Sequence, residues 1–121
     1  MPHLHMEYTA NLPELNADVA LLRFNNALVA SGQFAAESDI KSRAVKVETF
    51  KVGTALNERA FVYVNLALLS GRSPQIKKQL SEALLAVAQD LGPWPAGVEV
   101  QLAVEIVDMD RESYSKVLIS N

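Results

Sequence analysis

Residues 73–106 read SPQIKKQLSEALLAVAQDLGPWPAGVEVQLAVEI, and the spacing of their apolar residues changes midway. Ser73 and Pro74 are typical of a helix N-cap and first turn, and the apolar residues behind them recur every three or four positions. A Gly-Pro pair ends that pattern, and beyond it every second residue is apolar. Such alternation is typical of a strand with one buried face. The stretch therefore predicts a helix over 74–91 and then a strand over 98–106.

The first half of the chain has a similar order. Alternating apolar and polar residues predict a strand over 3–9. A helix is expected to begin near Asn16 or Asp18, which are good N-capping residue types, and to end at Gly32.

Two further extended segments are expected over 40–51 and 60–69, separated by turn-forming residues. The chain thus consists of two consecutive βαβ units. We expect an α+β fold in which the two units form a four-stranded mixed sheet with both helices on one face.

The length of 121 residues suits one domain, 1–121, with approximate halves 2–52 and 60–107 and a tail over 108–121. Within the tail, residues 114–119 are expected to form a final strand. The face of the sheet without helices is partly apolar, which favours an oligomer in a chain of this size.

The composition narrows the possible functions. Half of the residues are apolar and the net charge is -3 without any Lys/Arg-rich block, which argues against nucleic acid as a partner. The absence of cysteine excludes thiol chemistry, disulfides and thiolate metal sites. No leader segment and no apolar run near the roughly 18 residues of a membrane span are evident, so we expect no membrane contact and a cytoplasmic location.

The second residue is a candidate catalytic group. If Met1 is removed, as a small following residue usually permits, Pro2 becomes the N-terminus and its nitrogen becomes a secondary amine with a free lone pair. An ordinary α-amino group has a pKa of about 7.7–8.0, and burial or a nearby cation lowers that pKa. Pro2 is therefore a potential general base, and the alternative is an ordinary chain terminus.

Three basic residues are candidates for binding an anion. Lys41 and Arg43 alternate onto the same face of a predicted strand, and Arg72 lies in the turn just before the predicted helix cap. A helix N-terminus attracts anions, and an adjacent arginine adds a fork that matches a carboxylate. The alternative is that all three are solvated surface charges.

Other side chains allow two readings each. Phe50 and Trp94 are aromatic candidates for a pocket wall, although Phe50 fits the core equally and Trp94 fits a packing role in its turn. His3, His5 and Glu7 share one strand face, where two imidazoles and a carboxylate would suit a metal ion. The simpler reading of these three is a polar strand face, and we expect no metal.

Four short segments form a recognisable set: Pro2-His3, Ile40-Lys41-Ser42-Arg43, Ala60-Phe61-Val62 and Gly71-Arg72-Ser73. With their spacing along nearly the whole chain, they resemble the 5-carboxymethyl-2-hydroxymuconate Δ-isomerase family of the tautomerase superfamily. The resemblance implies a tautomerase-like fold and a homotrimer with active sites near subunit boundaries.

The resemblance also implies an isomerase that needs no metal or organic cofactor. Its substrate would be a small unsaturated 2-hydroxy carboxylic acid from aromatic-compound breakdown, such as 5-carboxymethyl-2-hydroxymuconate. Pro2 would be the acid/base, and Arg72 would contact a carboxylate or the transition state. Lys41 and Arg43 would bind further anionic groups of the substrate, and Phe50 would form an apolar wall.

One residue departs from the family pattern, and two alternative functions remain. Lys41 stands where the family enzyme carries arginine, and lysine cannot give bidentate carboxylate recognition. The first alternative is a non-catalytic trimeric relative that binds a small anion or has a structural role. The second is a hydratase or dehalogenase of the same superfamily, which would need a water-activating acid such as Glu7, Glu48 or Glu105 beside the proline.

Overall fold

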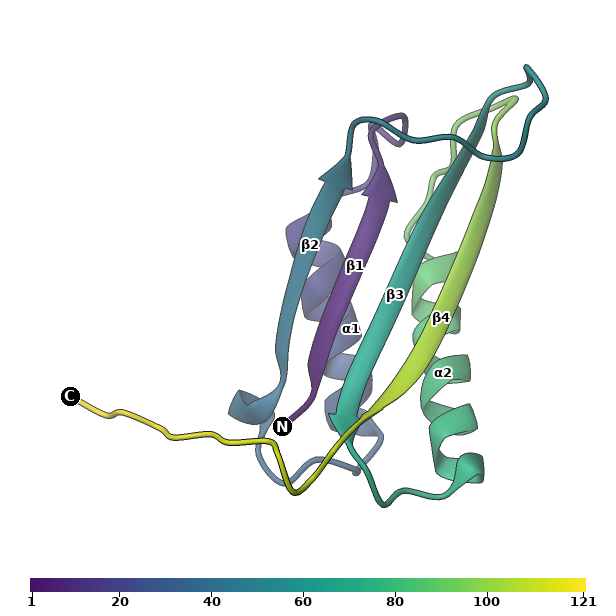
Figure 1. Ribbon diagram of the computed structural model, residues 1–121. Helices are drawn as coiled ribbons and strands as arrows, with labels where there is room; N and C mark the ends of the chain where they lie inside the picture. The colour runs from purple at the N-terminus through teal and green to yellow at the C-terminus, as the bar shows by residue number, and fades with distance from the viewer.

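One mixed four-stranded sheet, covered on one face by two helices, makes up most of the molecule (Figure 1). The computed structural model describes residues 1–121. Its elements in chain order are β1 (His3–Thr9), α1 (Ala17–Ala30), a 3-10 turn (Glu37–Asp39), β2 (Lys41–Val47), β3 (Arg59–Leu69), α2 (Pro74–Gln89) and β4 (Glu99–Met109).

The strand order is β2-β1-β3-β4. Strand β1 runs parallel to β2 and antiparallel to β3, and β3 runs parallel to β4. The predicted pair of βαβ units, the mixed sheet and the placement of both helices on one face are therefore confirmed (Figure 1).

Helix α1 begins where its capping residue predicts. The side chain of Asn16 accepts a hydrogen bond from the Val19 backbone N–H at 3.1 Å, which satisfies one of the free donors of the first turn. Ala20, Phe24 and Leu28 lie on the buried side of the helix and face the sheet. Their spacing of four residues aligns them along one stripe.

Helix α2 repeats this construction in the second unit. The Ser73 hydroxyl accepts a hydrogen bond from the Ile76 N–H at 3.2 Å, and Leu80 and Leu84 are buried. In the turn beyond the helix, Trp94 packs against the core. Neither helix combines the length and the apolar character that crossing a bilayer requires.

The core lies between the helices and the inner face of the sheet. Alternate residues of β3 point toward the helices, and each of them is at most 1% exposed: Ala60, Val62, Val64, Leu66 and Leu68. The opposite face carries no helix and mixes apolar with polar groups. There Glu105 accepts hydrogen bonds from the Tyr63 hydroxyl and from the Asn65 amide.

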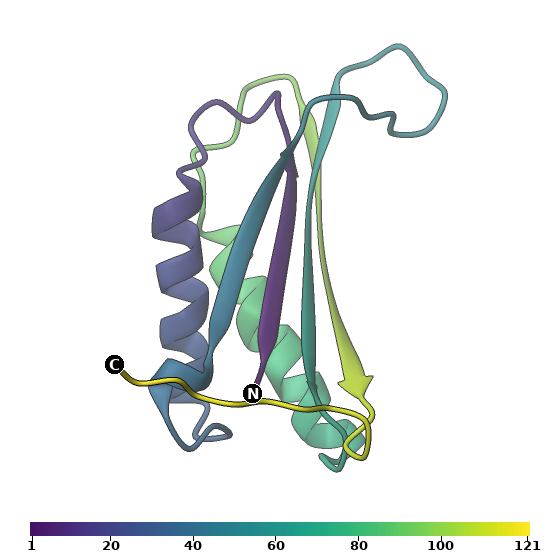
Figure 2. The same ribbon diagram turned by 60° about the vertical axis from the view of Figure 1, so that its left-hand side comes forward.

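The predicted strand over 114–119 is wrong. Beyond β4 the chain crosses the ends of the strands and passes beside the N-terminus, as both Figure 1 and Figure 2 show. A segment that runs across strand ends meets no row of free backbone groups, so it cannot form a ladder. Side chains hold it instead, through Tyr114 to His3 and through Lys116 to Asp39.

The core predicts a strong contrast between two leucines of α1. Leu28 is 1% exposed and Leu22 is 63% exposed. Leu28→Ala should lower the free energy of unfolding by about 2–5 kcal/mol, because it leaves a cavity. Leu22→Ala should change it by less than about 0.5 kcal/mol. Urea unfolding at one fixed protein concentration measures both, and equal losses would contradict this account of the core.

Candidate active site

One end of the sheet collects chain segments that are far apart in the sequence. β1 and β2 both begin there, while β3 and β4 both end there, because β1 is antiparallel to β3. Pro2 precedes β1, and its carbonyl accepts a hydrogen bond from the backbone N–H of Lys41, the first residue of β2, at 3.2 Å. Arg72 and Arg111 follow β3 and β4.

A cavity of about 250 Å³ opens at this end. The Pro2 side chain is fully buried on its wall. Where Met1 is attached, the Pro2 nitrogen is an amide and has no basicity. Met1 also lines the cavity, and the other lining residues come from the loop after α1, from the end of β3 and from the segments after β3 and β4: Gln33, Phe34, Ala35, Asp39, Leu68, Leu69, Arg72 and Arg111.

Arg72 is held by backbone carbonyls and by an aromatic ring. Its guanidinium donates to the Gln33 carbonyl at 2.7 Å and to the Leu69 carbonyl at 3.4 Å. The guanidinium carbon lies 4.9 Å from the centre of the Phe34 ring. Its Nε is buried and has no hydrogen-bond partner. The preceding Gly71 has a φ of 125°, a conformation that side chains disfavour, so glycine is required for the turn that presents Arg72.

Lys41 lies near a cation and a carboxylate from other segments. Its Nζ donates to the Asp39 carbonyl at 2.5 Å, while the Asp39 carboxylate pairs with the Lys116 Nζ at 2.8 Å. Burial, followed by the nearby Lys116 charge, lowers the pKa of Lys41. The hydrogen bond from Lys116 lowers the pKa of Asp39, so that carboxylate is ionised at neutral pH.

Arg43 lies on the same strand face and contacts a histidine. Its guanidinium donates to His3 Nδ1 at 3.0 Å, and His3 Nε2 lies 3.0 Å from the Tyr114 hydroxyl. Burial, together with the charges of Lys41 and Arg43, lowers the pKa of His3. These contacts favour a neutral imidazole whose Nδ1 accepts and whose Nε2–H donates.

The polar face of β1 does not form a metal-ligand set. His5 turns to Glu7, with 3.4 Å between Nε2 and Oε1, while His3 is occupied by Arg43 and Tyr114. No three histidine or carboxylate side chains are grouped closely enough to hold a metal ion. The structure therefore gives the metal alternative no support.

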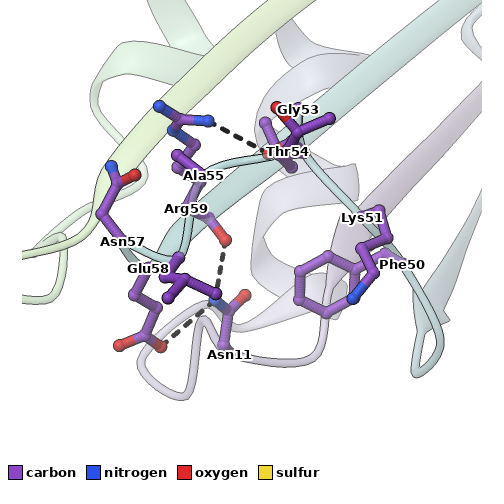
Figure 3. Close-up of a pocket in the computed structure, with 11 residues that line it drawn as sticks. Asn11, Phe50, Lys51, Gly53, Thr54, Ala55, Asn57, Glu58 and Arg59 are labelled. Carbon is purple, nitrogen blue, oxygen red and sulfur yellow. Dashed lines mark hydrogen bonds between the residues drawn. The ribbon is translucent and has the colours of Figure 1, made fainter.

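Phe50 lies at the opposite end of the sheet, beyond the end of β2. Its ring packs edge-to-face against Phe61, with 6.2 Å between the ring centres. Figure 3 shows it on the wall of a second cavity, of about 580 Å³, formed largely by the loop over 50–59. In that loop region the Asn11 amide donates to the Arg59 carbonyl at 3.0 Å. Within one chain, Phe50 is not brought together with Pro2.

Several residues at the Pro2 cavity escape detection from sequence. Arg111 follows β4 and donates from Nε and NH2 to the Ser70 carbonyl, at 3.0 and 2.8 Å. Nothing in its neighbouring sequence marks it, because its place depends on where β4 ends. Asp39 carries a weak signal, since it lies two residues before Lys41 and therefore near the start of the same predicted strand.

Comparison with known families settles where the chain belongs. The model of the 5-carboxymethyl-2-hydroxymuconate isomerase family matches residues 2–119. The chain belongs to this family. The resemblance noted from the sequence is thus confirmed, and the protein is an isomerase of the tautomerase type.

Solved structures agree with this assignment. A 5-carboxymethyl-2-hydroxymuconate isomerase from Deinococcus radiodurans R1 is 30% identical, covers 96% of this chain and 88% of its own, and gives a TM-score of 0.83. A 5-carboxymethyl-2-hydroxymuconate delta-isomerase is 17% identical over 98% and 88% of the two chains, with a TM-score of 0.74. A fused 4-OT wild-type symmetric trimer is 22% identical over 94% and 90%, with a TM-score of 0.66. The last two show the shared fold. No curated protein sequence matches the chain.

The surroundings of His3 predict its titration. Its pKa should lie below about 6.5, the ordinary histidine value, because burial and the neighbouring cations, Lys41 and Arg43 foremost, oppose protonation. Arg43→Met should raise that pKa, since it removes one of those cations and the hydrogen bond to Nδ1. Arg23→Met, on α1, is the matched control and should leave it unchanged. An NMR titration of the His3 ring measures all three, and an unshifted His3 in Arg43→Met would contradict the described contacts.

Proposed function

We propose that this isomerase moves a proton within a small unsaturated 2-hydroxy carboxylic acid, such as 5-carboxymethyl-2-hydroxymuconate, with Pro2 as the acid/base. The proposal requires removal of Met1, which frees the Pro2 nitrogen. The observation that carries it is that Pro2 and Arg72 line the same cavity, at an end of the sheet where lysines and arginines gather. No organic cofactor or metal takes part.

The reaction is a proton transfer that leaves the oxidation state unchanged. The neutral Pro2 nitrogen takes the proton of the enol oxygen or of a carbon, and the electrons left behind spread along the conjugated acid as a dienolate. The protonated proline then returns a proton to another carbon of that system. Arg72 stabilises the negative charge that develops in the transition state, and it can do so best where water is excluded. Lys41 and Arg43, which lie on β2 and do not themselves line the cavity, would bind further anionic groups of the substrate that extend beyond it.

Burial of the terminus favours a neutral base, and three nearby cations add to that effect. Burial lowers the pKa of the terminal amine on Met1; Asp39 opposes this, and the Lys41, Lys116 and Arg72 charges add to it. After processing, the Pro2 amine would lie one residue further along in the same cavity and be exposed to the same charges. A lowered pKa leaves a larger fraction of the amine unprotonated at neutral pH, which a general base needs.

We further propose a homotrimer in which Phe50 forms part of a neighbouring subunit's site. The face of the sheet without helices carries half-exposed apolar side chains, among them Val45 and Val107, and one solved relative is a symmetric trimer. Because Phe50 lies at the far end of its own sheet, a contribution of Phe50 to the Pro2 cavity would have to come from another copy.

The hydratase or dehalogenase alternative has little support from the position of the acids. Glu7 and Glu105 lie on the face without helices, where they contact His5 and Tyr63, and Glu48 follows β2 at the other end of the sheet. Within one chain none of them lines the Pro2 cavity. In the trimer proposed above, Glu48, two residues before Phe50, is the only one of the three that would come near a neighbouring subunit's site together with Phe50. The one carboxylate that lines the cavity within one chain, Asp39, is occupied by Lys116.

Replacing the proline tests the base directly. Pro2→Ala keeps a terminal amine but makes it primary, so kcat for 2-hydroxymuconate ketonisation should fall by about 10- to 100-fold, less than the full contribution of a general base. Intact mass must first show that Met1 is absent from both proteins. An unchanged kcat in the processed variant would contradict the role of Pro2, and absence of turnover in the parent protein would favour the non-catalytic, anion-binding alternative.

The pH dependence of the rate gives an independent test with two opposite shifts. If Pro2 must be unprotonated, kcat/KM rises with pH through its pKa. Lys41→Met removes a cation and should raise that pKa, whereas Asp39→Asn removes an anion and should lower it. Lys78→Met, an exposed change on α2, is the control and should leave the profile in place. Shifts of the same sign in the first two variants would show that the observed pKa belongs to another group.

A further inference from the structure

Two arginines from separate segments meet at one turn beside the Pro2 cavity. The turn between β3 and α2 contains Arg72 itself, and its Ser70 carbonyl accepts both hydrogen bonds from Arg111. Gly71 lies between Ser70 and Arg72 in the chain, and a Cβ added to it would stand 3.5 Å from the Arg111 NH2. The turn therefore carries Arg72 and anchors the Arg111 guanidinium, and both arginines line the same cavity.

Both guanidinium groups retain donors for a ligand. Arg111 uses Nε and NH2 on the Ser70 carbonyl, and its NH1 has no partner. Arg72 uses one N–H of each terminal nitrogen on the Leu69 and Gln33 carbonyls, which leaves the second N–H of each nitrogen without a partner. Guanidinium groups carry five N–H donors in a planar fork that matches a carboxylate.

No acid of the protein neutralises this pair of arginines. Neither Arg72 nor Arg111 forms a salt bridge, whereas Arg23 and Arg59 on other surfaces do. Asp39 is the only acidic side chain on the cavity wall, and Lys116 already pairs with it. The cavity therefore holds two unpaired positive charges, and one carboxylate would satisfy only one of them.

We propose that Arg111 binds the second carboxylate of a dicarboxylate substrate and so makes the site selective for diacids over monoacids. Arg72 then binds the carboxylate nearer the reacting atoms, and the NH1 edge of Arg111 receives the distal one. This inference rests on the proposed function, because it takes the Pro2 cavity as the active site. It adds a substrate-binding residue and a reason for the choice of substrate class.

Kinetics with two acids test this selectivity. 2-Hydroxymuconate has the distal carboxylate, and 2-hydroxy-2,4-pentadienoate lacks it. In Arg111→Gln, kcat/KM for the diacid should fall roughly tenfold to hundredfold, mainly through KM, as expected for one lost charged hydrogen bond. The value for the monoacid should stay within about twofold. Arg72→Gln should lower both values, and Arg23→Gln, at a surface away from the cavity, should lower neither.

Two outcomes would overturn the proposal. Equal losses for both acids in Arg111→Gln would mean that the residue only supports the fold of the site, and no loss for either would mean that it does not touch substrate. Arg111→Lys provides a second variant if Arg111→Gln does not fold. It keeps the charge without the fork, so the preference for the diacid should fall to an intermediate value.

A binding measurement separates this proposal from the proposed reaction. trans,trans-Muconate and sorbate are unreactive acids of the same length. Muconate has two carboxylates, and sorbate has a methyl group in place of the second one. Calorimetry should show at least about tenfold tighter binding of muconate to the Met1-free protein, and nearly equal binding of both acids to Arg111→Gln. If the parent protein turns over neither hydroxy acid but shows this preference, the reaction is wrong and the role of Arg111 stands. Equal binding of both acids to the parent protein overturns the role of Arg111.

Discussion

The antiparallel pairing of β1 with β3 is the contact on which the rest of the structure depends. It places His3 opposite Ala67 and joins two βαβ units, each with parallel strands, into one sheet. Since β1 begins where β3 ends, the residues before β1 meet the turn after β3. Parallel pairing inside each unit then brings the start of β2 and the end of β4 to the same end of the sheet. The candidate site is thus built from four segments that meet at one end of the sheet.

Core burial secures this pairing and therefore the site. Leu4 and Met6 of β1 and Val64 and Leu66 of β3 are completely buried beneath the helices. A shift of the register by one residue would turn either set of side chains to the face without helices. Because several apolar side chains would be exposed at once, the register has a single favourable setting, and the position of Pro2 beside the turn at Arg72 follows from it.

The electrostatics of the site are local and oppose the overall charge. The chain has a net charge of -3, yet most of the ionised groups at the Pro2 cavity and its rim are lysines and arginines. The tail supplies part of this arrangement, since Lys116 occupies Asp39 and leaves Arg72 and Arg111 without an acidic partner. Such a concentration of positive charge in a small cavity favours an anionic ligand without making the whole protein basic.

Hydrophobic periodicity by itself determined the two helices, the four strands and their order, because each of those elements buries one face and repeats with its own period. It failed for 114–119, where apolar residues lie in a segment that meets no strand edge. Pro2 and Arg72 were recognisable from the sequence because short motifs surround them. The sequence did not reveal Arg111 as a residue of the site, and it did not reveal that Phe50 lies far from Pro2. Both depend on which strand termini lie at the same end of the sheet. That is set by long-range strand pairing, which no local sequence pattern records and which is decided only in the tertiary structure.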